Sequence, residues 1–145
     1  LGADAAINYR TQDFAAEVKT LTEGRGVNVV LDMVGGAYMA RNIRSLGMDG
    51  RLVLIAFLQG SKVQDFDFVQ VMVRRLTITG STMRPRTTAQ KGAIAAELRD
   101  KVWPVLDAGR CPPVIHATFP LAQAAEAHRL MESSQHIGKI MLSVV

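Results

Sequence analysis

Cysteine and long apolar runs are scarce in this sequence, and each scarcity excludes a class of protein. The only cysteine among the 145 residues is Cys111, so the chain forms no internal disulfide and carries no cysteine-rich zinc site. A single free thiol is typical of a reducing, cytoplasmic setting. No stretch approaches the ~20 consecutive apolar residues that a membrane helix requires, so we expect no membrane partner.

Charge of one sign is scarce too. The 17 lysines and arginines exceed the 13 aspartates and glutamates only slightly (net charge +4), and they are scattered along the chain. A nucleic-acid-binding domain concentrates basic residues on one face and adds aromatic residues for stacking, whereas aromatic residues are 6% of this chain. We therefore expect no nucleic-acid partner. The hydrophobic content of 48% is sufficient for a packed core.

Short apolar, β-branched segments alternate with segments of helical periodicity. The first kind predicts strands at residues 5–9, 27–33, 52–57, 76–80, 114–117 and 139–144. The second predicts helices at residues 11–22, 39–46, 66–75 and 121–131, and a long helix from Thr87 that Pro104 kinks or shortens. Such alternation predicts βαβ units and an α/β fold with a parallel sheet. The early strands are apolar almost throughout, which is typical of strands covered on both faces.

Five segments, taken in order, resemble the medium-chain dehydrogenase/reductase superfamily over the whole chain. Residues 1–10, 29–36, 50–55 and 76–82 resemble the third to sixth strands of its Rossmann-type nucleotide-binding domain, and residues 138–142 resemble its last strand. Within the superfamily, Gly80-Ser81-Thr82-Met83-Arg84-Pro85-Arg86 and Ala127-His128-Arg129-Leu130-Met131-Glu132 are most similar to the NAD(P)H quinone oxidoreductases related to zeta-crystallin. The resemblance implies a zinc-independent quinone reductase.

The glycine-rich turn of that superfamily is absent from these 145 residues. Family members carry it after their first strand, where backbone N–H groups hold the cofactor pyrophosphate. No G-x-G-x-x-G occurs here, and the closest glycine pair, Gly24 and Gly26, follows a helix and precedes a strand. The resemblance therefore implies a C-terminal part of such an enzyme. Residues 1–86 would belong to the nucleotide-binding domain without its first two strands, and residues 87–145 to a linking helix and the catalytic domain. We expect this part to be inactive alone.

The resemblance places cofactor contacts at two strand ends near the start of the chain, where ligands bind in open α/β sheets. Tyr9 would donate a hydrogen bond to the 2′-phosphate of NADPH, with Arg10 as a weaker candidate; NADH is the alternative cofactor. Val34 and Gly35 would contact the adenosine half. The structural alternatives are a strand-end aromatic residue at Tyr9 and a tight turn that requires glycine at Gly35.

Two further positions would lie near the nicotinamide. Ile55 and Phe57 end a predicted strand and would supply backbone and apolar contacts, although a phenylalanine after a buried strand is more often part of the core. Lys139 follows a glycine near the C-terminus and would be a cationic contact. Its alternative is a solvated lysine at a strand start.

No residue of the chain is predicted to be catalytic or to bind a metal. The spacings of His116, His128 and His136 do not place two of them on one helix face, and no cysteine or carboxylate pair joins them. No G-x-S-x-G nucleophile motif occurs. Asp32 could equally cap the following helix, and we assign it no catalytic role.

The resemblance implies hydride transfer from NAD(P)H to a quinone or enone, by a homodimer whose subunits pair through the strand at residues 76–80. Two alternatives stay open. One is a fragment of a zinc-dependent alcohol dehydrogenase of the same superfamily, which cysteine and histidine ligands upstream of Leu1 would identify. The other is a small non-catalytic α/β binding domain, which a complete central parallel sheet within the chain would identify.

Overall fold

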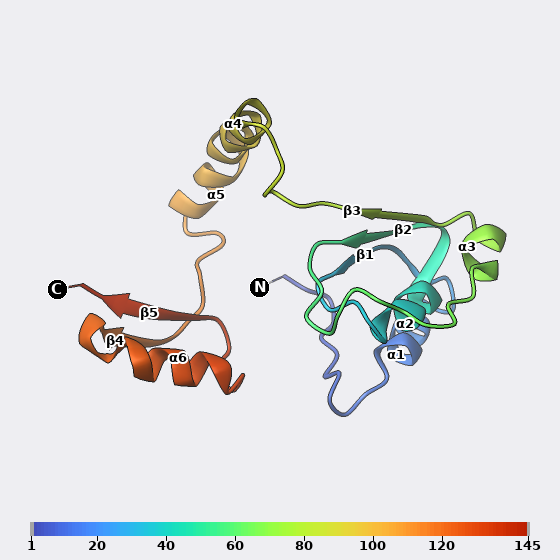
Figure 1. The fold of residues 1–145 in the computed structure, drawn as a ribbon, viewed down its shortest axis with the longest axis horizontal. Helices are drawn as coiled ribbons and strands as arrows, with labels where there is room; N and C mark the ends of the chain where they lie inside the picture. Colours follow the sequence, from blue (N-terminus) through green and yellow to red (C-terminus); the bar gives the residue numbers. More distant parts are fainter. Residues whose placement is uncertain (1, 145) are drawn as a thin grey trace. The chain divides into compact units, whose positions relative to one another are not determined.

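Helices and parallel strands alternate along the chain in the computed structural model, which describes residues 2–144 and confirms the α/β prediction (Figure 1). The chain divides into two units, Gly2–Thr87 and residues 88–144. The first contains α1 (Phe14–Leu21), β1 (Val27–Asp32), α2 (Tyr38–Ser45), β2 (Leu46–Leu54), α3 (Val69–Val73) and β3 (Thr77–Gly80). The second contains α4 (Thr88–Glu97), η1 (Leu98–Val102), α5 (Trp103–Asp107), β4 (Ile115–Pro120), η2 (Leu121–Gln123), α6 (Ala124–Glu132) and β5 (Lys139–Ser143).

One face of the first unit's sheet carries its core. The strands run parallel in the order β1-β2-β3, and Val30, Leu52 and Ile78 lie opposite one another in register. Register neighbours point to the same face, and on this face Leu52 is completely buried. The buried cluster around it comprises Ile43, Leu46 and Leu76, so α2 and the segment before β3 cover this face.

The opposite face of the sheet differs from the sequence-based expectation. Val29 is 58% exposed and Leu31 is 63% exposed, although both were expected to be covered. Their burial would need a second layer of structure, and no helix of the Gly2–Thr87 unit packs on them. The apolar sequence of β1 therefore indicates that both of its faces can be buried. This unit contains a layer that buries only one of them.

Residues 5–9 do not form the predicted strand. Asn8 instead organises a turn in which its carbonyl oxygen accepts from the N–H groups of Thr11 (3.0 Å) and Gln12 (2.9 Å). Its side-chain oxygen accepts from the N–H of Arg10 (3.1 Å). A strand requires a neighbouring strand for its backbone groups, and among residues 2–144 β1 pairs with β2 alone. The apolar composition of residues 5–9 was therefore insufficient to predict a strand.

The strand β2 begins earlier and ends earlier than predicted. It starts at Leu46, which the periodicity placed in a helix, and its register with β1 shifts between Val27 and Val29. Arg75 ties this irregular start to the end of α3, since its guanidinium donates to the Asp49 carboxylate over 2.8 and 2.7 Å. These hydrogen bonds hold the pKa of Asp49 below its usual value. Both groups are exposed, so the pair contributes little to stability.

The second unit confirms the effect of Pro104. The predicted long helix changes to a π-helix over Leu98–Val102, and α5 follows with the proline in its first turn. Proline has no N–H to donate and is tolerated at the start of a helix. Further along, β4 and β5 pair in parallel with α6 between them in sequence. No helix among residues 2–144 combines the length and apolarity needed to span a bilayer.

Candidate functional site

Two loops follow the carboxyl ends of β1 and β2 and extend the sheet beyond its strands. The N–H of Ile55 donates to the carbonyl of Asp32 (2.9 Å), that of Leu58 to Met33 (3.0 Å) and that of Gln59 to Val34 (2.8 Å). Backbone hydrogen bonds therefore fix the loop after β1 against the loop after β2. In this unit the edge at which open α/β sheets bind ligands is therefore formed by two loops that are hydrogen-bonded to each other.

A buried carboxylate shapes the loop after β1. Asp32 is 4% exposed, and its side chain accepts from the N–H groups of Val34 (2.7 Å) and Gly35 (3.1 Å to Oδ2). Asp32 does not cap the following helix, which was one option for it. Helix α2 starts only at Tyr38, behind Ala37 and without a side-chain cap, and the turn at residues 33–36 lies between. The carboxylate therefore accepts from the N–H groups of that turn and not from those of the first turn of α2.

Gly35 is required by the packing of the two loops. Its φ is +68°, and a Cβ atom there would lie 2.6 Å from the carbonyl oxygen of Gly60 and 2.7 Å from Cδ1 of Phe57. The tight-turn interpretation of Gly35 is thus supported by the geometry. Phe57 is 48% exposed, so it isn't a core residue. One edge of its ring abuts the Gly35 backbone, and much of the side chain remains accessible.

Four of the predicted cofactor positions, Val34, Gly35, Ile55 and Phe57, come together on these two loops. Ile55 is 41% exposed, and the loops add two further exposed apolar side chains, those of Met33 and Leu58. Sequence analysis missed Leu58, because nothing in its local pattern distinguishes it from a core leucine. The two loops therefore present exposed apolar surface beside the ends of β1 and β2.

Tyr9 and Lys139 are not part of these two loops. Tyr9 is 60% exposed in the Asn8 turn, and its hydroxyl makes no hydrogen bond within residues 2–144. Lys139 opens β5 in the second unit, where its N–H donates to the carbonyl of Val114 (2.7 Å) and its side chain is exposed. Both side chains are exposed to solvent within the described residues.

The residues that the structure describes contain no group of three or more histidine, cysteine or acidic side chains able to hold a metal. His116 and His136 approach each other with ring centroids 6.3 Å apart, and His116 Nδ1 accepts from the N–H of Ile137 (3.4 Å). Two histidines without a third ligand among the described residues do not make up a zinc site.

Comparison with known proteins places these features in context. A family model for zinc-binding dehydrogenases matches residues 1–142. A 2-haloacrylate reductase of a Burkholderia species is 31% identical, over 98% of this chain and 42% of its own length. A rat quinone oxidoreductase is 24% identical, over 97% of this chain and 41% of its own. The chain thus spans about two fifths of these relatives.

Solved structures agree. An NAD-dependent alcohol dehydrogenase superposes with a TM-score of 0.76 at 33% identity, over 99% of this chain and 39% of its own. A mycobacterial protein in complex with NADPH superposes with a TM-score of 0.72 at 27% identity, over 97% of this chain and 43% of its own. The fold that these comparisons share is the Rossmann-type fold of dehydrogenases.

Proposed function

Because this chain belongs to the zinc-binding dehydrogenase family, we propose that it forms part of a zinc-independent, NADPH-dependent reductase of quinones or activated enones. Family membership confirms the resemblance to the medium-chain dehydrogenases/reductases and supports an oxidoreductase as the parent activity. It argues against the non-catalytic binding domain. The similarity of residues 80–86 to quinone oxidoreductases favours a zinc-independent enzyme. The single cysteine favours the reducing cytoplasm.

The observation that carries this proposal is the pair of fixed loops at the carboxyl edge of β1 and β2. Their half-exposed side chains, Ile55 and Phe57, offer apolar contacts to a planar ring, and Val34 lies beside them. A bound nicotinamide would supply the hydride. In this proposal Tyr9 donates to the 2′-phosphate, and Lys139 contributes a positive charge near the nicotinamide.

No residue of the chain is proposed to transfer a proton. The proposed role of the chain is to bind and orient the cofactor. Residues 1–145 contain no G-x-G-x-x-G turn to hold the pyrophosphate. We therefore propose that they do not reduce a substrate by themselves, and the test uses the full-length protein that carries them.

The test is oxidation of NADPH by the full-length protein, with 1,4-benzoquinone or 2-chloroacrylate as the acceptor. We expect turnover that a zinc chelator does not inhibit. Replacing Tyr9 by Phe removes one hydrogen bond to a charged phosphate, worth about 1.5–3 kcal/mol. The KM for NADPH should rise about tenfold or more, and that for NADH should not change.

Tyr38 provides the matched control, since Tyr38→Phe removes the other tyrosine hydroxyl of the chain. This variant should leave both KM values unchanged. Chelator-sensitive oxidation of an alcohol, without quinone reduction, would support the alcohol dehydrogenase instead. An equal effect of Tyr9→Phe on NADPH and NADH would reject the role of Tyr9.

We also propose that two copies pair through β3. Within the described sheet β3 is an outer strand, as predicted, with β2 on one side. The N–H of Ser81 donates to the carbonyl of Leu54 (3.0 Å), and N–H groups alternate in direction along a strand. The N–H of Ile78 therefore points to the open edge, where a second copy would accept it.

Ile78→Pro should convert the dimer to a monomer, because proline removes this edge donor and leaves the donors to β2 in place. Light scattering after size exclusion measures the change. Ile78→Val keeps the N–H and should remain dimeric. A monomeric parent protein, or a dimer that persists in the proline variant, would contradict edge pairing through β3.

A further inference from the structure

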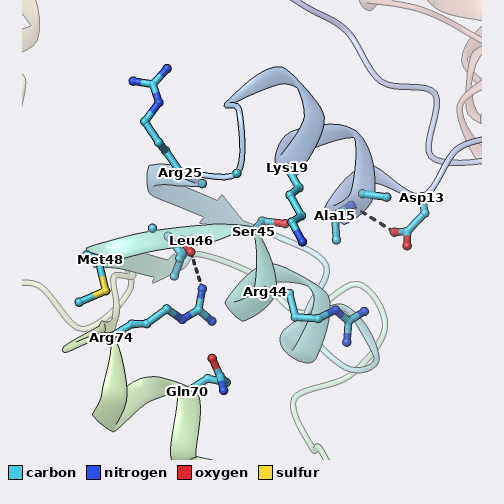
Figure 2. A pocket seen from close by; sticks show the side chains of 14 residues that line it. Asp13, Ala15, Lys19, Arg25, Arg44, Ser45, Leu46, Met48, Gln70 and Arg74 are labelled. Atoms are coloured by element: carbon cyan, nitrogen blue, oxygen red, sulfur yellow. Dashed lines mark hydrogen bonds between the residues drawn. The ribbon is translucent and has the colours of Figure 1, made fainter.

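A cavity of about 560 Å³ lies between α1, α2 and α3 of the first unit (Figure 2). Its polar lining includes Lys19, Arg25, Arg44, Ser45, Gln70 and Arg74. Residues 24–26, which precede β1, and residues 46–48, which open β2, also line it. The cavity therefore lies at the amino ends of these strands, whereas the proposed cofactor loops follow their carboxyl ends.

The cavity has an excess of positive charge. Four cationic side chains line it against one carboxylate, that of Asp13. The Asp13 carboxylate already accepts from the N–H of Ala15 (3.1 Å) and from Nη2 of Arg41 (3.4 Å). Neither Lys19 nor Arg44 forms an ion pair within residues 2–144. These two charges lack a protein counterion, as a site for an anion requires.

Two hydrogen bonds hold Arg74 in place in the lining of the cavity. Its Nη1 donates to the carbonyl of Leu46 (2.5 Å), drawn in Figure 2, and its Nη2 donates to that of Ile43 (2.8 Å). Its Nε is buried and has no hydrogen-bond partner among the described residues. A buried donor without a partner is costly. This guanidinium thus has a fixed orientation, and it adds its positive charge to the lining of the cavity.

The floor of the cavity is rigid backbone. A Cβ atom on Gly26 would lie 2.6 Å from the N atom of Gly47, and one on Gly47 would lie 2.5 Å from the carbonyl oxygen of Arg25. The two chain segments touch, so this surface cannot relax inward. Ala15 and Met48 add apolar lining. Rigid walls reduce the conformational entropy that the protein loses when a ligand binds.

We propose that this cavity binds a small organic phosphate ester through the positive charges of Lys19, Arg44 and Arg74. A phosphate carries about two charges and three acceptor oxygens, which matches several separate donors better than a carboxylate does. The volume lies within the ~300–1,000 Å³ of small-molecule sites and leaves room for an organic group against Ala15 and Met48. The site is separate from the proposed cofactor loops and does not depend on their function.

Calorimetric titration of the full-length protein with phenyl phosphate tests this site, and the cofactor is kept saturating as NADP⁺. We expect binding that persists under saturation and weakens with added salt. Lys19→Gln and Arg44→Gln should each weaken it about tenfold, the effect of one charge-assisted hydrogen bond. Both side chains are exposed, so the variants should fold normally.

Arg51→Gln is the matched control, because Arg51 is an exposed arginine of β2 outside the cavity lining. It should bind phenyl phosphate like the parent protein. Four results would overturn the proposal: no binding at millimolar phenyl phosphate, loss of binding under saturating NADP⁺, equal binding of phenol, or unchanged affinity in Arg44→Gln.

Discussion

Replacing Asp32 by Ala is expected to lower the free energy of unfolding by about 2–4 kcal/mol, because it leaves two N–H donors without their acceptor. The carboxylate is 4% exposed and binds the N–H groups of Val34 and Gly35. Water cannot readily replace it, since Gly35 is buried as well. Urea denaturation followed by circular dichroism measures the change.

Asp32→Asn is the matched control for this effect. The amide is almost the same size and keeps one acceptor oxygen, so about half of the loss should be recovered. The loop after β1 should also lose its fixed position in the Ala variant, and cofactor affinity should fall with it. Equal stability of the Ala and Asn variants would contradict this account, because the acceptor oxygen that the amide retains would then contribute nothing to the turn.

The strands that the sequence predicted well are strands that pair with a neighbouring strand of the chain. Residues 27–33 and 76–80 were placed correctly, because β-branched apolar residues with turn residues at both ends correspond to β1 and β3. Residues 5–9 have the same kind of composition and form no strand. Composition is local, whereas a strand depends on a neighbour that the composition does not describe.

The candidate site was predictable in outline for a topological reason. Carboxyl ends of parallel strands share one edge, so residues after β1 and after β2 had to come close. The contact between Gly35 and Phe57 was not predictable, since it depends on the register that sets Asp32 opposite Leu54. No sequence pattern indicates that Lys19, Arg44 and Arg74 line one cavity either, because they come from the segments around three different helices.

The substitution Gly35→Ala should be strongly destabilising. Alanine at a φ of +68° costs about 1–2 kcal/mol. The added methyl group would also lie 2.6 Å from the Gly60 oxygen and 2.7 Å from Phe57 Cδ1, and overpacking of this kind costs about 1–3 kcal/mol. We expect a loss of about 2–5 kcal/mol in the free energy of unfolding, measured in urea.

Gly60→Ala separates the two causes, because Gly60 also has a positive φ (+92°) but a Cβ there meets no atom within 4 Å. This variant should lose only the backbone contribution of about 1–2 kcal/mol. The double variant Gly35→Ala/Phe57→Ala tests the steric part. Removing the ring relieves one overlap and leaves that with the Gly60 carbonyl, so stability should return only in part. If Gly35→Ala and Gly60→Ala were equally stable, the two loops would not be packed as closely as their hydrogen bonds indicate, and the exposed surface of Ile55 and Phe57 would lose its fixed support.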